Sequence, residues 1–308
     1  MKDVGQRGAE VAALKHAIPY VRMFKGKTFV VKLGGETIAD ELRFRGLIEQ
    51  VDALHQVGIR VVLVHGGGPQ STALATALGI PTRMIDGRRV TDEKNLEVSI
   101  MTLNGQLNTR LLGMCRAFGL PAVGLSGIDA GLVRAKKRPP VSTSEGEQVD
   151  FGWVGDIQAI EPAILASLLE KGFLPVLSSL GADETGQILN INADTVAAAV
   201  AVALGAEKLI LVTGAPGILE KLEDPRSLIS YTDLEGLAEL REKGSLSGGM
   251  KPKADAIEAA IKGGVKRVHL IPWNVQDSLL MEIFTNEGIG TLVVEDIDVL
   301  SEAEQAAG

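Results

Sequence analysis

Two lysines and an aspartate that stand near glycine-rich turns are the residues best suited to chemistry. Lys32 lies in an apolar run that ends in a pair of glycines, Lys253 follows Gly248-Gly249, and Asp194 precedes an alanine-rich segment. A charged side chain inside an apolar strand needs a partner, and a lysine is a point charge suited to phosphoryl oxygens. The pattern favours phosphoryl transfer between bound anions, in which catalysis is mostly positioning and charge neutralisation.

A longer glycine-rich stretch, Val61–Gln70, has the sequence VVLVHGGGPQ. Its four apolar residues predict a buried strand, its three glycines predict a loop without side chains, and the apolar spacing from Ala73 to Leu78 predicts a helix. This order places bare N–H groups and a positive helix N-terminus against an anion. Because Gly34-Gly35 forms a similar turn after another apolar run, we expect one site for a polyanion.

The composition is that of a soluble globular protein with one large or two modest domains. The 308 residues are 45% hydrophobic, 23% charged and 4% aromatic, with a formal charge of −8. The negative charge and the few aromatics argue against a partner that is nucleic acid. The single Cys115 excludes an internal disulfide and a cysteine-based metal cluster. No signal peptide and no apolar run of about 20 residues are visible, so we expect a cytoplasmic protein without a membrane partner.

Several common catalytic motifs are absent from the sequence. It contains no Gly-x-x-x-x-Gly-Lys-Ser/Thr, no protein-kinase catalytic set and no Rossmann Gly-x-Gly-x-x-Gly after the first strand. One cysteine and four scattered histidines give little support to a nucleophile triad. The polar residues that remain near glycine turns at the ends of predicted strands are Lys32, Arg89, Asn190, Asp194 and Lys253. This set again fits phosphoryl transfer.

Apolar strands alternate with helical patterns along the whole chain, which predicts an α/β fold with a mainly parallel sheet covered on both faces, a three-layer αβα sandwich. We expect a helix over residues 10–25, broken or kinked at Pro19, and a hairpin turning at Asp86-Gly87. The run Lys136–Pro140 is expected to be an exposed basic loop. The predicted strands are 28–33, 61–64, 121–125, 173–178, 208–212, 267–271 and 290–294, and the other predicted helices include 40–56, 92–118, 161–171, 195–204, 234–243, 252–262 and 277–284.

Five motifs, taken in order, resemble those of N-acetyl-L-glutamate kinases, a branch of the amino acid kinase family. The resemblance covers roughly residues 15–295 and implies the amino acid kinase fold over 27–298, with a substrate-binding lobe at about 27–185 and a nucleotide-binding lobe at about 186–298. It implies ATP-dependent phosphorylation of a side-chain carboxylate to an acyl phosphate, a step of arginine biosynthesis, with Mg²⁺ bound to ATP. The motifs are Val31–Gly35, Val64–Gln70, Gly87–Asp92, Asn190–Asp194 and Gly248–Lys253.

The resemblance also implies roles for the charged residues. Lys32 and Lys253 would be catalytic by stabilising the phosphoryl group in flight, and Asp194 would hold both lysines through charge-assisted hydrogen bonds. Asp194 could instead serve only as a helix N-cap or dipole partner. We expect the first role, and the two are compatible.

On the acceptor side, Gly67 and Gly68 would donate backbone N–H groups to the substrate carboxylate or to the phosphoryl group. Arg89 would bind the other carboxylate of acetylglutamate, and Asn190 would bind its amino-acid end. The neighbouring Arg88 becomes the binding residue if the register differs by one position. Otherwise it is a solvent-facing hairpin residue.

The nucleotide side departs from the usual family pattern at one position. The family usually has Thr-Asp-x-Pro-Gly where this chain has Thr213-Gly214-Ala215-Pro216-Gly217, so a carboxylate near the nucleotide is missing. Glu36 and the stretch Ile271–Asn274 are similar instead to the kinase-like domain of acetylglutamate synthases. The expected nucleotide-binding residues are Gly34, Gly35, Thr213, Gly214, Gly217, Gly249 and Met250.

The N-terminal helix, within residues 1–26, resembles the extra helix of arginine-inhibited acetylglutamate kinases. There it links dimers into a hexamer, and arginine binds near it and near the segment that matches Glu287-Gly288. We therefore expect a homo-oligomer, a hexamer or a dimer, that arginine inhibits. The helix could alternatively dock on its own subunit. Residues 299–308 are expected to be a tail.

Two other functions stay open. One is a related kinase that acts on aminoadipate or its carrier-protein conjugate. The other is a catalytically weakened kinase-fold regulatory subunit or arginine sensor, against which the retention of Lys32, Asp194 and Lys253 argues. Synthase activity from this chain is not expected, because no acetyltransferase domain is visible after the last predicted strand.

Overall fold

The computed structural model describes residues 4–85, 88–142, 146, 148–285 and 288–297. The helices are α1 (Val4–Phe24), α2 (Gly35–Ala39), α3 (Glu41–Gln56), α4 (Gly68–Ala77), α5 (Glu93–Ile100), the π-helix η1 (Met101–Asn108), α6 (Thr109–Ala117), the short 3₁₀ turns η2 (Asp129–Gly131) and η3 (Pro225–Ser227), α7 (Ala163–Glu170), α8 (Ala193–Ala203), α9 (Leu234–Glu242), α10 (Met250–Lys262) and α11 (Ser278–Phe284).

The main sheet has eight strands in the order β16-β18-β17-β13-β1-β2-β10-β5. All its neighbouring pairs are parallel except β17 with β18. Its strands are β1 (Thr28–Leu33), β2 (Arg60–His65), β5 (Ala122–Ser126), β10 (Leu174–Ser178), β13 (Lys208–Thr213), β16 (Tyr231–Thr232), β17 (Arg267–Pro272) and β18 (Thr291–Val293). The four strands that follow residue 207 therefore form one half of the sheet, and β1 joins them to β2, β10 and β5.

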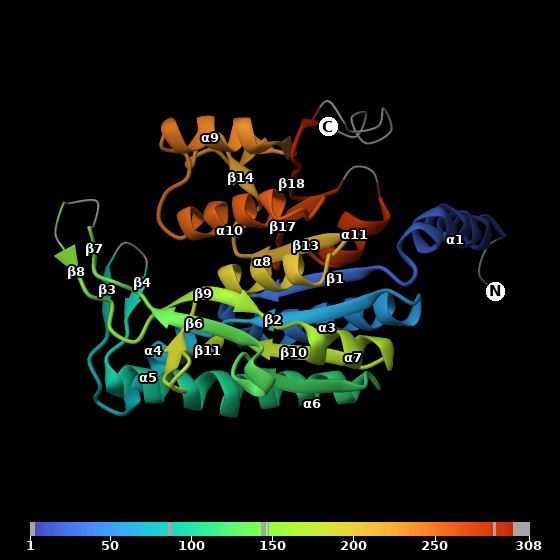
Figure 1. Ribbon diagram of the computed structural model, residues 1–308. Helices are drawn as coiled ribbons and strands as arrows, with labels where there is room; N and C mark the ends of the chain where they lie inside the picture. Colours follow the sequence, from blue (N-terminus) through green and yellow to red (C-terminus); the bar gives the residue numbers. More distant parts are fainter. Residues whose placement is uncertain (1–3, 86–87, 143–145, 147, 286–287, 298–308) are drawn as a thin grey trace.

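Helices cover both faces of this sheet, as Figure 1 shows, so the expected three-layer α/β architecture is confirmed. On β1, Val30 belongs to the core under α7, α8, α9 and α10, whereas Phe29, Val31 and Leu33 belong to the core under α3, η1, α6 and α11. Side chains alternate between the faces of a strand. Lys32 therefore emerges on the same face as Val30, toward α8 and α10.

Smaller β elements flank the main sheet, and two of the hairpins, β3–β4 and β7–β8, lie at the end of the molecule opposite α1 (Figure 1). They are a four-stranded sheet in the order β12-β11-β6-β9 and three hairpins. Their bounds are β3 (Arg83–Ile85), β4 (Arg88–Val90), β6 (Val133–Lys137), β7 (Val141–Ser142), β8 (Gln148–Val149), β9 (Gly155–Ile160), β11 (Leu180–Ala182), β12 (Ile188–Asn190), β14 (Ile218–Leu219) and β15 (Leu228–Ile229). The hairpin expected over 80–91 is β3–β4, and its predicted turn, Asp86-Gly87, lies outside the described residues.

Three local predictions need correction. Helix α1 continues through Pro19, so the helix is not broken there, since a proline removes only one helical hydrogen bond and this helix lies on an exposed surface. The helix predicted over 92–118 contains the π-helical turn η1. Lys136 and Lys137 belong to strand β6 rather than to a loop. Among the described residues, no helix is both long and apolar enough to span a membrane.

Candidate active site

The two lysines and the aspartate singled out in the sequence meet in one ion network. Nζ of Lys32 lies 2.8 Å from Oδ1 of Asp194, and Nζ of Lys253 lies 2.9 Å from Oδ2 of the same carboxylate. They come from β1, from α10 and from the first turn of α8, three elements that meet on one face of the sheet. Lys32 and Asp194 are 7% and 4% exposed. The bridging carboxylate thus fixes the spacing of two positive charges.

Burial and charge act on these groups in opposite directions. Burial lowers the pKa of Lys32, and the carboxylate of Asp194 offsets only part of that effect. Burial opposes ionisation of Asp194, but the charges of Lys32 and Lys253 outweigh it and keep its pKa below the ordinary value. Asp194 is therefore an ionised bridge at neutral pH.

Asp194 is not the residue that caps α8. The side-chain oxygen of Asn192 accepts hydrogen bonds from the backbone N–H groups of Asp194 and Thr195, at 2.8 and 3.2 Å. Because Asn192 satisfies these helix-end donors, the Asp194 carboxylate is left to the two lysines.

The two glycine turns predicted from the sequence touch each other. An ideal Cβ on Gly35 would lie 3.1 Å from Cα of Gly67 and 3.0 Å from Cδ of Pro69, so a side chain at this position would clash. The amide nitrogen of Gln70 also donates to the carbonyl oxygen of Gly35 at 2.6 Å. Gly67 is the N-cap of α4, with no side-chain hydrogen bond at the cap. The backbone of both turns therefore borders a common space.

Arg89 and Arg88 point to different partners. Nη2 of Arg89 donates to the carbonyl oxygen of Gly68 at 3.0 Å and to the hydroxyl of Thr72. Nη1 of Arg89 is buried and has no hydrogen-bond partner among the described residues. Arg88 instead lies 3.7 Å from Asp255 in an exposed ion pair. Of the two arginines, Arg89 is thus the one whose Nη1 has N–H groups left to bind a ligand.

The ion network and the glycine turns line one cavity of about 740 Å³. Asn190 borders it from the end of β12, where its amide donates to the hydroxyl of Thr91 at 3.2 Å. Of the residues predicted to bind substrate or nucleotide, those that line this cavity are Gly35, Gly67, Gly68, Arg89, Asn190 and Gly249.

The other predicted nucleotide-binding residues lie around the carboxyl ends of the sheet strands. Gly34 is the N-cap of α2, Thr213 ends β13, and Met250 begins α10. Gly214 and Gly217 follow β13 in the connection to β14. None of these five is among the residues that border the cavity.

Two residues at this site were not singled out as site residues in the sequence. Oε2 of Glu36 lies 3.1 Å from the ideal Cβ position of Gly214, so a carboxylate from the first turn of α2 occupies the space beside this glycine. Arg138, expected in an exposed loop, lines the cavity and forms an ion pair with Asp156 at 2.7 Å. The pairing of neighbouring strands, rather than a sequence motif, brings these two side chains to the cavity. In the sequence, only the departure of Glu36 from the family pattern indicated that either residue belongs to the site.

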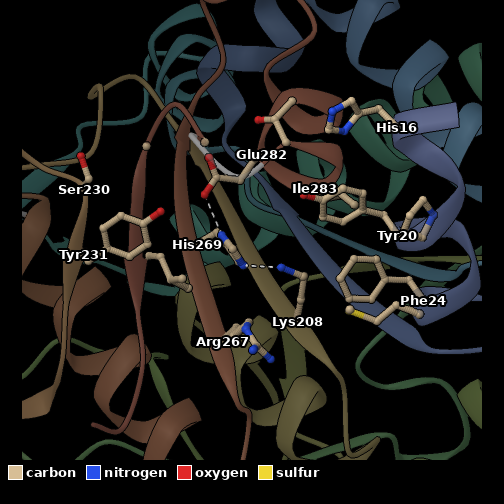
Figure 2. Close-up of a pocket in the computed structure, with 16 residues that line it drawn as sticks. His16, Tyr20, Phe24, Lys208, Ser230, Tyr231, Arg267, His269, Glu282 and Ile283 are labelled. Atoms are coloured by element: carbon tan, nitrogen blue, oxygen red, sulfur yellow. Dashed lines mark hydrogen bonds and ion pairs between the residues drawn. The ribbon is translucent and has the colours of Figure 1, made fainter. Parts of the chain in front are cut away.

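A second cavity, of about 490 Å³, lies between α1 and the ends of β13 and β17 (Figure 2). His269 is central to it: Nδ1 lies 2.7 Å from Oε1 of Glu282, and Nε2 lies 2.9 Å from Nζ of Lys208. A lysine can only donate, so His269 carries its proton on Nδ1. Gly288 lines this cavity, and Glu287 lies outside the described residues.

Comparison with known proteins assigns the chain and its fold to a family. Residues 27–272 match the model of the amino acid kinase family. The chain belongs to the amino acid kinase family. This kinase is 47% identical over 290 residues to the acetylglutamate kinase of Myxococcus xanthus, and the match covers 92% of the kinase and 94% of that relative.

Solved structures agree with this assignment. N-acetylglutamate synthase from Neisseria gonorrhoeae, in complex with coenzyme A and N-acetyl-glutamate, superposes on 93% of the kinase with a TM-score of 0.80 and 29% identity. The same synthase with coenzyme A and L-arginine gives a TM-score of 0.78 and 28% identity over 93% of the kinase. The kinase spans 63% and 65% of those two synthase chains.

Proposed function

We propose that this protein transfers the γ-phosphoryl group of MgATP to the side-chain carboxylate of N-acetyl-L-glutamate, in a step of arginine biosynthesis. The product is N-acetyl-L-glutamyl 5-phosphate. One observation carries the proposal: Asp194 holds Lys32 and Lys253 in a cavity that the glycine turns also line. The acetylglutamate kinases similar to the chain over 91–94% of its length support the choice of acceptor.

The reaction needs charge neutralisation rather than a general base. A carboxylate with an ordinary pKa near 4 is already ionised at neutral pH. One of its oxygens attacks the γ-phosphorus, the bond to the bridging oxygen of ADP breaks, and ADP leaves with that electron pair. Lys32 and Lys253 neutralise the charge on the oxygens of the transferring group. The bound phosphates also favour the charged form of Lys32 and so oppose the effect of burial on its pKa.

The acceptor would lie on the glycine-loop side of the cavity, in a lobe formed by about residues 27–185. Arg89 would bind its α-carboxylate through Nη1, which lacks a protein partner. Asn190 would bind the acetylated amino end, and the N–H groups of Gly67 and Gly68 would bind the reacting carboxylate. These groups fix one end of the acid and aim the other at the phosphoryl group.

The nucleotide would lie on the side formed by about residues 186–298. Gly34, Gly35, Gly249 and Met250 would surround its phosphates, and the loop from Thr213 to Gly217 would border the rest of the molecule. Mg²⁺ would enter with ATP as part of the substrate, and the exposed carboxylate of Glu36 is available to bind its water shell. We place the enzyme in the cytoplasm, where ATP is plentiful.

A substrate panel tests the assignment. Release of ADP would be measured with saturating MgATP and N-acetyl-L-glutamate, N-acetyl-aminoadipate, N-acetyl-aspartate or L-glutamate. We expect kcat/KM to be highest with acetylglutamate. A preference for the aminoadipate compound would make the protein the related kinase, and no turnover with any acid, together with binding of arginine, would make it a regulatory subunit.

We also propose that L-arginine inhibits the enzyme by binding the second cavity (Figure 2). The carboxylate of Glu282 and the rings of Tyr20 and His16 border this cavity and suit a guanidinium group. The arginine complex of the structurally similar synthase supports the choice of ligand. Arginine should raise the melting temperature of the wild type and inhibit it. A variant that combines His16→Ala with Tyr20→Ala should lose both effects and retain basal activity.

Finally, we propose that α1 joins copies of the chain into a hexamer built from dimers. Its last turn packs on its own subunit, where Tyr20 meets Phe284 edge to face at 6.4 Å. Earlier in the helix Val11, Leu14 and Ile18 are 52%, 66% and 39% exposed at helical spacing. Deletion of residues 1–25 should reduce the sedimentation coefficient and arginine sensitivity. If both stayed unchanged, this role of α1 would be wrong.

A further inference from the structure

His65, the residue before the glycine loop, is fully buried although it is polar. It ends β2 and shares a face of the strand with Val61 and Leu63, whose core lies under η1 and α6. Its Nδ1 lies 3.3 Å from the carbonyl oxygen of Gly66, and its Nε2 lies 3.2 Å from the amide nitrogen of Asn108. The imidazole therefore connects the glycine loop to the last residue of the π-helix η1.

The surroundings of Asn108 determine the tautomer of His65. The amide nitrogen of Asn108 also donates to the carbonyl oxygen of Val176 at 3.0 Å, and the longer contact to the carbonyl oxygen of Leu125, at 3.4 Å, shares one of its two protons. Carbonyl oxygens only accept, so this end of the amide must be its NH₂ group. Nε2 of His65 consequently accepts, and the proton lies on Nδ1, which donates to Gly66. Burial lowers the pKa of His65 to about 4, so the ring is neutral at neutral pH.

This hydrogen bond also orients the next amide. In a trans peptide the C=O of Gly66 and the N–H of Gly67 point in opposite directions across one rigid plane. A carbonyl held toward His65 therefore turns the N–H of Gly67 away from it, and no described residue accepts a hydrogen bond from this N–H. Both glycines line the cavity that holds Lys32.

The π-helix holds the same loop from a second direction. An ideal Cβ on Gly67 would lie 2.3 Å from Leu107 and 3.0 Å from Leu103, so both leucines press against its backbone. The side chain of Asn104 also forms a hydrogen bond with Ser178 at the end of β10. π-Turns inside α-helices occur frequently at functional sites. Here the π-helical turn contacts the glycine loop through Leu103, Leu107 and Asn108.

We propose that His65 is a positioning residue for phosphoryl transfer: held by Asn108 as the Nδ1–H tautomer, it fixes the Gly66–Gly67 peptide so that the Gly67 N–H points at the reacting carboxylate. This inference rests on the proposed function. The imidazole does not touch the substrate and gives up no proton during the reaction. It acts through one backbone amide.

Two variants separate this role from mere packing. The amide of asparagine overlays Nδ1 of histidine, so His65→Asn keeps a donor for Gly66. Glutamine overlays Nε2, so His65→Gln keeps the contact with Asn108 and loses the donor. We expect His65→Gln to reduce kcat about 10- to 100-fold, below the loss typical of a deleted oxyanion donor, without changing KM for MgATP. His65→Asn should stay within about threefold of the wild type.

Melting temperatures and a ¹⁵N NMR spectrum of histidine-labelled wild type complete the test. The expected spectrum contains the signals of two neutral rings with Nδ1 protonated and Nε2 unprotonated, His65 and His269, and the signals lost in His65→Asn are assigned to His65. Equal losses of kcat in both variants, in step with their melting temperatures, would overturn the proposal, and so would an Nε2-protonated ring. The spectrum needs no activity, so failure of the wild type to phosphorylate acetylglutamate would reject the proposed function separately.

Discussion

Oδ1 of Asp194 lies 2.8 Å from Nζ of Lys32, and this contact joins the first turn of α8 to the central strand β1. Both side chains are buried, so the contact is shielded from solvent. It places a positive charge next to the glycine turns and keeps it there before any nucleotide binds. Preorganised charge of this kind is usually the largest single contribution to the stabilisation of a transition state.

Asp194→Asn would remove the bridging charge with little change in shape. Two buried lysines would then repel each other, and breaking a buried pair costs about 3–5 kcal/mol of stability. Because Asp194 raises the pKa of Lys32 and burial lowers it, the variant's Lys32 would have a lower pKa than the wild type's. We expect kcat to fall about 100- to 1,000-fold and to recover partly as pH decreases from 9 to 6. A kcat–pH profile parallel to that of the wild type would contradict this explanation.

Arg89→Lys would replace a planar fork with a single ammonium group. We expect KM for acetylglutamate to rise about 10- to 100-fold, a loss of roughly 1.4–2.8 kcal/mol, with KM for MgATP unchanged. Arg88→Lys is the matched control, since Arg88 also borders the cavity but its guanidinium group forms an exposed ion pair with Asp255. Initial-rate kinetics measure both constants. A large effect from Arg88→Lys and none from Arg89→Lys would exchange the roles of the two arginines.

Gly214→Asp would introduce the carboxylate that the family resemblance leads us to expect at this position. Its Cβ would lie 3.1 Å from Oε2 of Glu36, so two carboxylates would share one space. We expect KM for MgATP to rise about 3- to 10-fold, on the order of 1 kcal/mol. Adding Glu36→Gln to this variant should return KM for MgATP to the wild-type value. Additive effects in this double-mutant cycle would show that the two positions do not interact.

Acid should destabilise the protein through two buried histidines. Burial lowers the pKa of both His65 and His269 to about 4, below the 6.5 of an unfolded histidine. The unfolded state therefore takes up protons first, and the stability present above pH 6.5 is lost as pH falls toward 4. At pH 5 each histidine accounts for a loss of about 2 kcal/mol.

Urea unfolding at pH 7 and pH 5 measures this loss. His65→Asn has one titrating ring fewer, so its loss should be smaller by about 2 kcal/mol. His16→Asn is the control, because His16 is exposed on α1, and should behave like the wild type. An equal loss in all three proteins would assign the acid sensitivity to other groups.

Much of the fold and site follows from local patterns. A lysine in an apolar strand and glycines at strand ends predicted that Lys32 meets a partner and that the two turns share a site. The proximity of Glu36 to Gly214 was not predictable, because it depends on β1 and β13 being neighbours in the sheet. The π-helix η1, which ends at Asn108, was also not predictable, since its residues have ordinary helical spacing and only the tertiary contacts of the folded chain show the wider turn.

Trapping the product with hydroxylamine tests the central claim most directly. Wild-type protein with MgATP, N-acetyl-L-glutamate and hydroxylamine should form acetylglutamyl hydroxamate in amounts that match the ADP released. The same assay with Lys32→Ala should yield at least about 100 times less product, because one of the two charges on the phosphoryl group is gone. No hydroxamate from the wild type at saturating substrates, or equal amounts from Lys32→Ala, would contradict the account.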